Sequence, residues 1–135
     1  MDHDIATMKK ELEGLRVLFV EDEEPLRLQT ALFLRKFFPL LETAENGEEG
    51  WERFDRHPHD LVISDLRMPG MNGGELVTRV KERAPETLAI ITSGLSSGDV
   101  AADVPADARL VKPVSIEAFL ETMHRLLARR GSLRE

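Results

Sequence analysis

The chain has 135 residues, of which 41% are hydrophobic, and its formal net charge is −7. This length suffices for one domain that buries about two-thirds of the surface of the unfolded chain. The lack of cysteine excludes disulfide bonds, thiol nucleophiles and cysteine-based zinc sites, and the acidic charge argues against non-specific binding to nucleic acids or anionic membranes.

The first residues predict a short helical extension. Ile5, Met8 and Leu12 recur at helical spacing within residues 1–14. Acidic residues near the start are not typical of a secretory signal, and no apolar run approaches the roughly 20 residues of a membrane span. We therefore expect a soluble, cytoplasmic domain over residues 15–130, followed by a tail at 131–135.

Five short apolar runs predict the strands of a sheet. They lie at Arg16–Val20, Leu40–Ala44, Asp60–Ser64, Thr87–Thr92 and Ala108–Val111. Helical patterns alternate with these runs, which favours a parallel sheet with helices on both faces.

The helical patterns have recognisable ends. They cover Glu23–Phe38, Gly47–His57, Gly73–Ala84 and Ser115–Arg130. Asn46 and Ser115 are expected to cap their helices, and Gly131 is expected to end the last one. In the segment Ser93–Ala108, a glycine and a proline leave room for only a short or irregular helix.

The predicted strands end in acids, a hydroxyl and an amine. Glu21 and Asp22 follow the first strand, and Asp65 follows the third. Thr92 ends the fourth strand, and Lys112 follows the fifth. Because ligands of open parallel sheets bind beyond the carboxyl ends of the strands, we expect these side chains to share one crevice.

Such a cluster predicts a bound cation and phosphoryl chemistry. Two carboxylates 4 Å apart repel by about 4 kcal/mol at an effective dielectric constant near 20. An open site rich in carboxylate oxygens suits Mg²⁺, which takes one or two carboxylates together with a phosphoryl oxygen. Asp65 would then be a nucleophile, while Lys112 and Thr92 would hold the other phosphoryl oxygens.

Four stretches of the sequence resemble the receiver (CheY-like) domain of bacterial two-component response regulators. They are VLFVEDEEP, DLVISDLRMPGMNGGEL, AIITS and LVKPVSIEAFL, and the resemblance covers about Leu15 to Ala128. It implies an α/β fold of the flavodoxin-like or CheY-like kind. In this fold a doubly wound, five-stranded parallel sheet in the order 2-1-3-4-5 carries helices on both faces.

The resemblance also implies roles for individual residues. Glu21 and Asp22 match the acidic pair that binds Mg²⁺, and Asp65 matches the phosphoacceptor, which also contacts the metal. The backbone carbonyl of Arg67 matches a further metal ligand. The remaining matches are Pro69 and Gly73 in the loop after the acceptor, the switch hydroxyl of Thr92 and the invariant lysine, Lys112.

The same resemblance implies partners. A sensor histidine kinase would donate the phosphoryl group from a phosphohistidine, and the domain would catalyse only its own phosphorylation and dephosphorylation, so it is not expected to be an enzyme. A downstream target or output domain would bind the face formed by the segment Ser93–Ala108, the strand Ala108–Val111 and the last helix. A homodimer is compatible with this arrangement, whereas direct binding to nucleic acid or membrane is not expected.

Three features depart from the family pattern. Arg109 stands three positions before the lysine, where the family usually has tyrosine or phenylalanine. The aromatic side chain whose rotamer usually couples to the switch hydroxyl is therefore missing. Ser93 follows the switch threonine, which is a mild change, and the interval from Thr92 to Lys112 is short. These departures bear on the readout surface, not on the phosphorylation chemistry.

Three other functions compete with this interpretation. A Mg²⁺-dependent phosphohydrolase of the haloacid-dehalogenase kind needs an acid two residues after the nucleophile, where this chain has Arg67. A flavodoxin-like cofactor binder needs a hydroxyl-rich phosphate loop, whereas the sequence EDEEP would repel phosphate. A receiver-like interaction module that is never phosphorylated is favoured slightly by Arg109, although the intact acids, threonine and lysine weigh against it.

The histidines suggest no second site. His57 and His59 have the spacing of metal ligands, but we interpret the polar sequence RHPHD as a solvated loop. His124 flanks the apolar stripe of the last helix and is predicted to be structural, while Trp51 and Phe54 are predicted to lie in the core.

Overall fold

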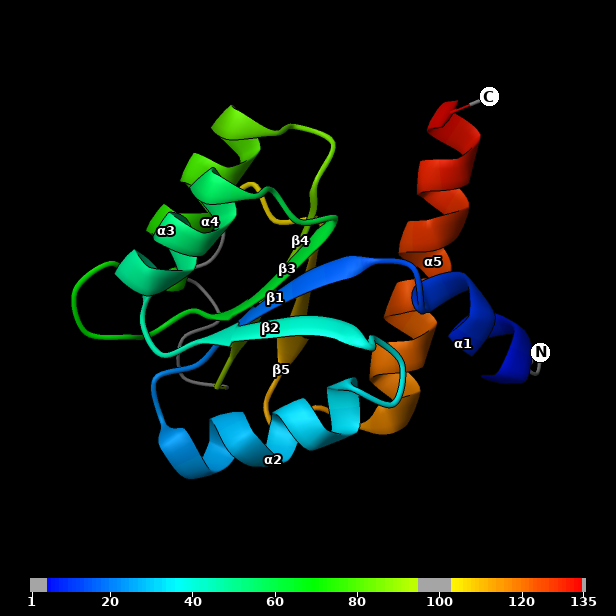
Figure 1. Ribbon diagram of the computed structural model, residues 1–135, viewed down its shortest axis with the longest axis horizontal. Coiled ribbons are helices and arrows are strands. Elements are labelled where there is room, and N and C mark those ends of the chain that lie inside the picture. The colour runs from blue at the N-terminus through cyan, green and yellow to red at the C-terminus, as the bar shows by residue number, and fades with distance from the viewer. Residues whose placement is uncertain (1–4, 95–102, 135) are drawn as a thin grey trace.

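A computed structural model describes residues 5–94 and 103–134, and shows a single parallel sheet between two layers of helices (Figure 1). The strand order is β2-β1-β3-β4-β5, which confirms the predicted topology. The strands are β1 (Arg16–Val20), β2 (Leu40–Ala44), β3 (Leu61–Asp65), β4 (Leu88–Ser93) and β5 (Ala108–Val111). The sequence therefore predicts three strands to the residue and places β3 and β4 one residue early.

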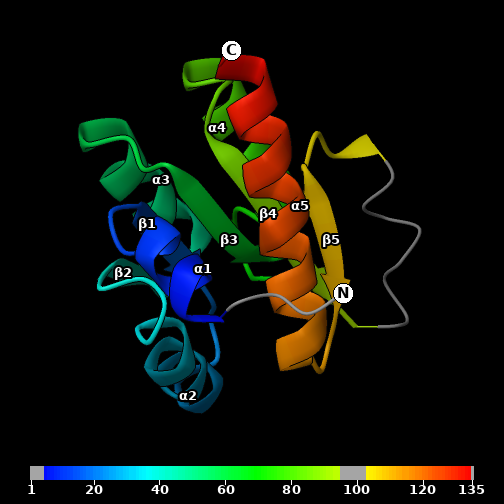
Figure 2. The ribbon, with the colours of Figure 1, turned by 90° about the vertical axis from the view of Figure 1, so that its right-hand side faces the viewer.

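Helices cover both faces of the sheet, as expected. The described helices are α1 (Ile5–Leu12), α2 (Glu24–Leu34), α3 (Gly47–Arg56), α4 (Gly73–Arg83) and α5 (Ile116–Arg134). Helices α1, α2 and α5 lie on one face, and α3 and α4 lie on the other (Figures 1 and 2). The short helix expected within Ser93–Ala108 falls mostly on residues 95–102, which lie outside the described part of the chain.

The two faces of the sheet carry separate cores, which is why the strands are apolar almost throughout. On the first face, Phe19 and Ile63 belong to a cluster with Phe119 of α5. The rings of Phe119 and Phe38 meet edge to face, with their centroids 6.0 Å apart. On the second face, alternate residues of the same strands pack against Phe54, Leu76 and Val80 from α3 and α4.

The predicted N-terminal helix is part of the first core. Met8 and Leu12 of α1 are buried in the same cluster as Phe37, and the ammonium of Lys9 lies 5.7 Å from the centroid of the Phe37 ring. Ile5, the third residue of the helical pattern, is exposed. The extension is therefore packed onto the domain through two of its three apolar residues.

The helix ends agree with the sequence at two points and differ at one. Asn46 accepts a hydrogen bond from Glu49 N–H and Ser115 accepts one from Ala118 N–H, so both predicted caps are confirmed. The prediction that Gly131 ends the last helix is wrong, because α5 continues to Arg134. A helical glycine costs about 1 kcal/mol relative to alanine, which is too little to end a helix that is held along its length by core contacts. None of the described helices is long and apolar enough to cross a membrane.

Candidate functional site: an acidic cluster with one lysine

The strand register brings the polar residues at the strand ends together. Val20 of β1 lies opposite Ser64 of β3, so the residues that follow them, Glu21 and Asp65, emerge side by side. Asp65 in turn lies opposite Thr92 of β4. Ser93 pairs with Val111 of β5, which places Lys112 at the same edge, and the Lys112 amide donates to the Ser93 carbonyl at 2.8 Å.

Three carboxylates form the acidic part of this cluster. One oxygen from each of Glu21, Asp22 and Asp65 lies within 4.8 Å of the others. Among the residues that the structure describes, this is the only group of three or more potential metal-binding side chains. Glu21 and Asp65 are buried, and Asp22 is partly exposed. The cluster thus combines two buried acids with one that solvent reaches.

Lys112 lies between two of the acids. Its Nζ is 3.1 Å from Glu21 Oε1 and 3.1 Å from Asp65 Oδ1. These contacts join strands β1, β3 and β5, which are far apart in the sequence. The expected convergence of the acids and the lysine at one edge of the sheet is therefore present in the structure.

One ammonium does not neutralise three carboxylates. Burial raises the pKa of Asp65, and the charge of Asp22 raises it further, although Lys112 opposes both effects. Burial likewise raises the pKa of Glu21 against the hydrogen bonds from Glu23 and Lys112. For Lys112, burial alone would lower the pKa, but the two neighbouring carboxylates outweigh it and raise the pKa overall. The site therefore favours additional positive charge.

The backbone around the cluster holds the acids in place. Glu21 Oε2 accepts a hydrogen bond from Glu23 N–H at 3.2 Å, and the carbonyl of Glu21 accepts one from the Arg27 guanidinium at 2.9 Å. The Ser64 hydroxyl donates to the carbonyl of Asp65 at 2.9 Å. The first contact orients the Glu21 carboxylate, and the other two hold the backbone of Glu21 and Asp65.

Thr92 and Lys112 also line a cavity that runs from the cluster into the protein. The cavity has a volume of about 520 Å³ and lies between α2 and the start of α5. Apart from Glu21, Thr92 and Lys112 at one end, its walls are largely apolar, with Phe33 and Phe119 among them. The cluster therefore adjoins an apolar space as well as solvent.

Two arginines lie at positions where the resemblance implies a role. Arg67 lies in the loop after β3, two residues beyond Asp65, and its side chain is exposed. Arg109 is exposed on the edge strand β5, and its guanidinium donates to the carbonyl of Val104. This hydrogen bond links Arg109 of β5 to the segment that precedes the strand.

The donor set fits Mg²⁺. Hard divalent cations of this size bind oxygen ligands and usually keep several waters, so two or three clustered carboxylates suffice. Burial is the main cause of the raised pKa values of Glu21 and Asp65, and a bound dication would oppose this shift by favouring the charged carboxylates. The triad of Glu21, Asp22 and Asp65 is typical of the Mg²⁺ site of receiver domains.

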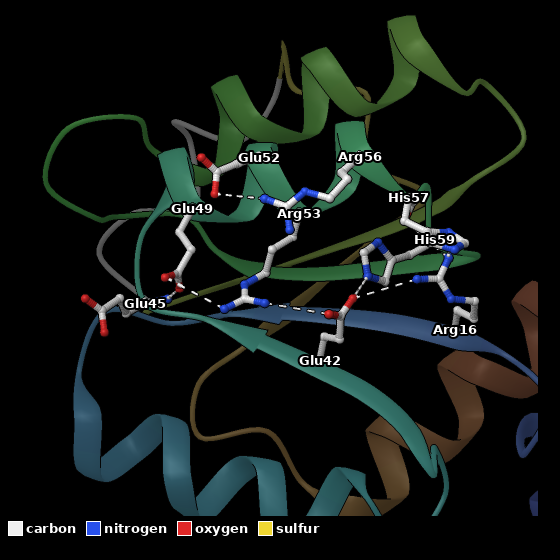
Figure 3. Close-up of polar contacts among 9 residues, drawn as sticks. All are labelled: Arg16, Glu42, Glu45, Glu49, Glu52, Arg53, Arg56, His57 and His59. Atoms are coloured by element: carbon white, nitrogen blue, oxygen red, sulfur yellow. Dashed lines mark hydrogen bonds and ion pairs between the residues drawn. The ribbon is translucent and has the colours of Figure 1, made fainter.

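A second charged cluster lies beside α3, and there the sequence interpretation of His59 as solvated is wrong. The His59 side chain is fully buried against the Phe54 ring, and its Nε2 lies 2.6 Å from Glu42 Oε1. Arg53 and Arg16 also face the Glu42 carboxylate, at 3.6 Å and 3.8 Å (Figure 3). His57 is exposed, as expected, and contacts Arg16.

Sequence reasoning missed His59 because its partner is on another strand. Glu42 is in the middle of β2 and His59 precedes β3, so nothing in the local pattern of either residue indicates the pair. His124 is exposed on α5, Phe54 is buried as predicted, and Trp51 is partly buried beside it.

Comparisons with known proteins agree with the geometry. The family model of the response regulator receiver domain matches residues 17–124. The response regulator ArlR of Staphylococcus aureus is 32% identical over 117 residues, which are 85% of this chain and 53% of that protein. A larger protein of Haloferax volcanii is 34% identical over 115 residues, which are 85% of this chain and 20% of that protein. The chain thus spans about half or less of these relatives.

Solved structures agree on the fold. A response regulator receiver domain protein from Clostridium thermocellum has a TM-score of 0.78 at 24% identity, with 87% of this chain and 98% of that chain covered. A CheY-like receiver domain protein from Methanospirillum hungatei has a TM-score of 0.76 at 25% identity, with 87% and 96% covered. The CheY-like α/β fold is therefore established for this chain.

Proposed function

Since this chain belongs to the receiver-domain family of two-component response regulators, we propose that it accepts a phosphoryl group on Asp65 with the help of Mg²⁺. One observation carries the proposal. The oxygens of Glu21, Asp22 and Asp65 gather within 4.8 Å, and the Lys112 ammonium lies 3.1 Å from Asp65. A nucleophilic carboxylate, a cation-binding acidic pair and a fixed positive charge are the components that phosphoryl transfer to an aspartate requires.

In the proposed reaction, a carboxylate oxygen of Asp65 attacks the phosphorus of a phosphohistidine on a sensor histidine kinase. A P–O bond forms while the P–N bond breaks, and the histidine nitrogen leaves with the electron pair. A bound Mg²⁺ would supply positive charge against the repulsion between the acids and the incoming group. Glu21, Asp22 and the backbone carbonyl of Arg67 would hold that ion together with Asp65.

Lys112 and Thr92 would bind the transferred group. The ammonium of Lys112 already lies against Asp65, so it can pair with a phosphoryl oxygen with little movement. Thr92 lies opposite Asp65 in the strand register, and its hydroxyl would report the phosphorylated state. The domain would catalyse only its own phosphorylation and dephosphorylation, as receiver domains typically do, and would act on no separate substrate.

A binding partner would recognise the phosphorylated state on the side of the molecule where β5 and α5 meet. Val111 and Ile116 are 50% and 57% exposed there, and such apolar side chains favour contact with a downstream target, an output domain or a second copy. This surface includes the segment before β5, of which residues 95–102 lie outside the described part of the chain. We place this exchange in the cytoplasm, where receiver domains generally operate.

The proposal is tested with acetyl phosphate and Mg²⁺, followed by the intact mass of the protein. We expect the addition of one phosphoryl group to the wild type and none to Asp65→Asn. Asp55→Asn is the matched control, because Asp55 is an exposed acid on α3 paired with Arg83. Labelling that persists in Asp65→Asn would place the acceptor elsewhere. The absence of labelling in the wild type would favour an interaction module that is not phosphorylated.

A further inference from the structure

Glu48 makes a contact that its neighbours on α3 do not make. Its Oε2 accepts a hydrogen bond from Met71 N–H at 3.0 Å, in the loop between β3 and α4. Glu49 instead turns back to the Glu45 amide at 2.8 Å, and Glu52 pairs with Arg56 one turn along the same helix. Glu48 is thus the first-turn acid of α3 that reaches the loop following Asp65.

Two glycines let this loop and the start of α3 approach each other closely. Gly70 has a φ of +74°, which favours glycine, and a Cβ atom there would lie 2.6 Å from Glu48 Oε2. On the helix, a Cβ atom at Gly47 would lie 2.3 Å from the carbonyl oxygen of Met71. The loop and the start of α3 each have a glycine at the point of closest approach. The hydrogen bond from Met71 N–H to Glu48 then joins them.

The two ends of the loop are fixed by other bonds. Leu66 N–H donates to the Thr92 carbonyl at 2.9 Å, and the Leu66 carbonyl accepts from Gly73 N–H at 2.9 Å. At the far end, Asn72 and Glu75 form a reciprocal capping box at the start of α4. Arg67 lies between these anchors as the second residue of the loop, and Glu48 holds the backbone further along, at Met71.

We propose that Glu48 is a positioning residue for Mg²⁺ binding at the acidic cluster. By accepting the Met71 amide, it fixes the course of the loop that begins directly after Asp65, and so fixes the backbone carbonyl of Arg67 relative to the three carboxylates. The inference rests on the proposed function, because it concerns the same metal site. Glu48 does not contact the metal; it acts through the loop.

The test compares three variants by calorimetric titration with Mg²⁺. Glu48→Ala removes both the charge and the hydrogen bond, and we expect it to weaken Mg²⁺ affinity about tenfold, the lower end of the range for residues that orient metal ligands. Glu48→Gln keeps an acceptor for Met71 N–H and should restore most of the affinity. Glu52→Ala removes the same charge from the same helix and should change the affinity less than twofold.

Amide hydrogen exchange provides a second readout. In Glu48→Ala, exchange at Met71 should become faster while that of the β-strands stays unchanged, which separates local loosening from general destabilisation. Equal weakening by Glu48→Gln and Glu48→Ala, or by Glu52→Ala and Glu48→Ala, would overturn the inference, because charge alone would then explain the effect. Unchanged affinity in Glu48→Ala, with normal binding by the wild type, would overturn the inference and leave the proposed function standing. Failure of the wild type to bind Mg²⁺ would refute the proposed metal site.

Discussion

The charged cluster at the end of the sheet and the one beside α3 have opposite compositions. At the end of the sheet, three carboxylates share the ammonium of Lys112. Beside α3, the carboxylate of Glu42 faces one histidine and two arginines, and Glu49 shares one of these arginines, Arg53 (Figure 3). The pKa values follow this difference: burial and neighbouring acids raise the pKa of Asp65, whereas the hydrogen bond from His59 lowers that of Glu42.

The difference separates a site that needs a ligand from a contact that supports the fold. The acids at the end of the sheet remain under-neutralised within the protein, so an added cation stabilises them. Glu42 is already surrounded by positive or hydrogen-bonding groups and gains little from an ion. Each cluster contains a buried ionisable side chain, Asp65 in one and His59 in the other, so burial alone does not distinguish them and the balance of charge does. Each of the following experiments changes that balance in one cluster.

The largest expected effect comes from Lys112→Met, which removes the ammonium that contacts both Glu21 and Asp65. Without Mg²⁺, the free energy of unfolding should fall by about 2 kcal/mol, less than for a fully buried pair because the lysine side chain is 28% exposed. Mg²⁺ should reverse part of this loss, since the ion then neutralises the acids. Urea unfolding with and without Mg²⁺ measures both quantities. Lys36→Met, at an exposed position after α2, serves as the control.

Glu21→Gln should weaken Mg²⁺ binding at least tenfold, or about 1.4 kcal/mol, because it removes one of the three clustered carboxylates. Glu24→Gln is a close control, since Glu24 belongs to the same acidic stretch but is largely exposed and pairs with Arg27 at 4.0 Å. Calorimetric titration gives both affinities. Similar losses in the two variants would mean that the general field of the acidic stretch, rather than the cluster, attracts the ion.

Glu42→Gln should lower the free energy of unfolding by about 1 kcal/mol. The carboxylate is 42% exposed, so solvent screens its attraction to Arg53 and Arg16, and the glutamine can still accept from His59. In contrast to Lys112→Met, the loss should be the same with and without Mg²⁺. A Mg²⁺-dependent loss would show that the two clusters are coupled, which would remove the distinction drawn above.

The smallest effect is on the pH dependence of stability. Burial lowers the pKa of His59 in the folded state, although Glu42 opposes this shift. The resulting stabilisation is complete above the unfolded value of about 6.5 and is lost as the pH falls toward the lowered pKa. The lowered pKa of Glu42 acts in the same direction below its unfolded value of 4.5.

The free energy of unfolding should therefore fall by less than about 1 kcal/mol between pH 7.5 and pH 5.5 through His59. Urea unfolding across this range measures the slope, which His59→Phe should reduce. An unaltered slope in His59→Phe would mean that another group governs the acid dependence.

The sequence predicts the end of the sheet better than the cluster beside α3, for a physical reason. In a parallel sheet all strands end at one edge, so acids that follow strands must meet wherever the sheet forms. The pairing of Glu42 with His59 depends instead on the register of β2 and on how the chain enters β3. Glu48 was missed for the same reason, because its contact with Met71 requires the positions of two elements 23 residues apart.

Local patterns were informative where a single element decides the outcome. Asn46 and Ser115 act as caps because their partners are three residues away in the same helix. The capping box of Asn72 and Glu75 has the same spacing, so the sequence carries that signal as well. The end of α5 depends on packing along the whole helix, and a single glycine was a poor guide to it.

Asp107 has a practical consequence for where the chain can be cut. This residue precedes β5, and its carboxylate pairs with Lys81 of α4 at 2.6 Å and with Arg129 of α5 at 2.8 Å, on opposite faces of the sheet. Arg129 lies beyond the match to the family model, which ends at residue 124. A fragment trimmed to residues 17–124 would keep the ion pair between Asp107 and Lys81 but lose the one between Asp107 and Arg129. It would also lose the buried Met8 and Leu12. Recombinant versions for biophysical work should therefore retain at least residues 5–129.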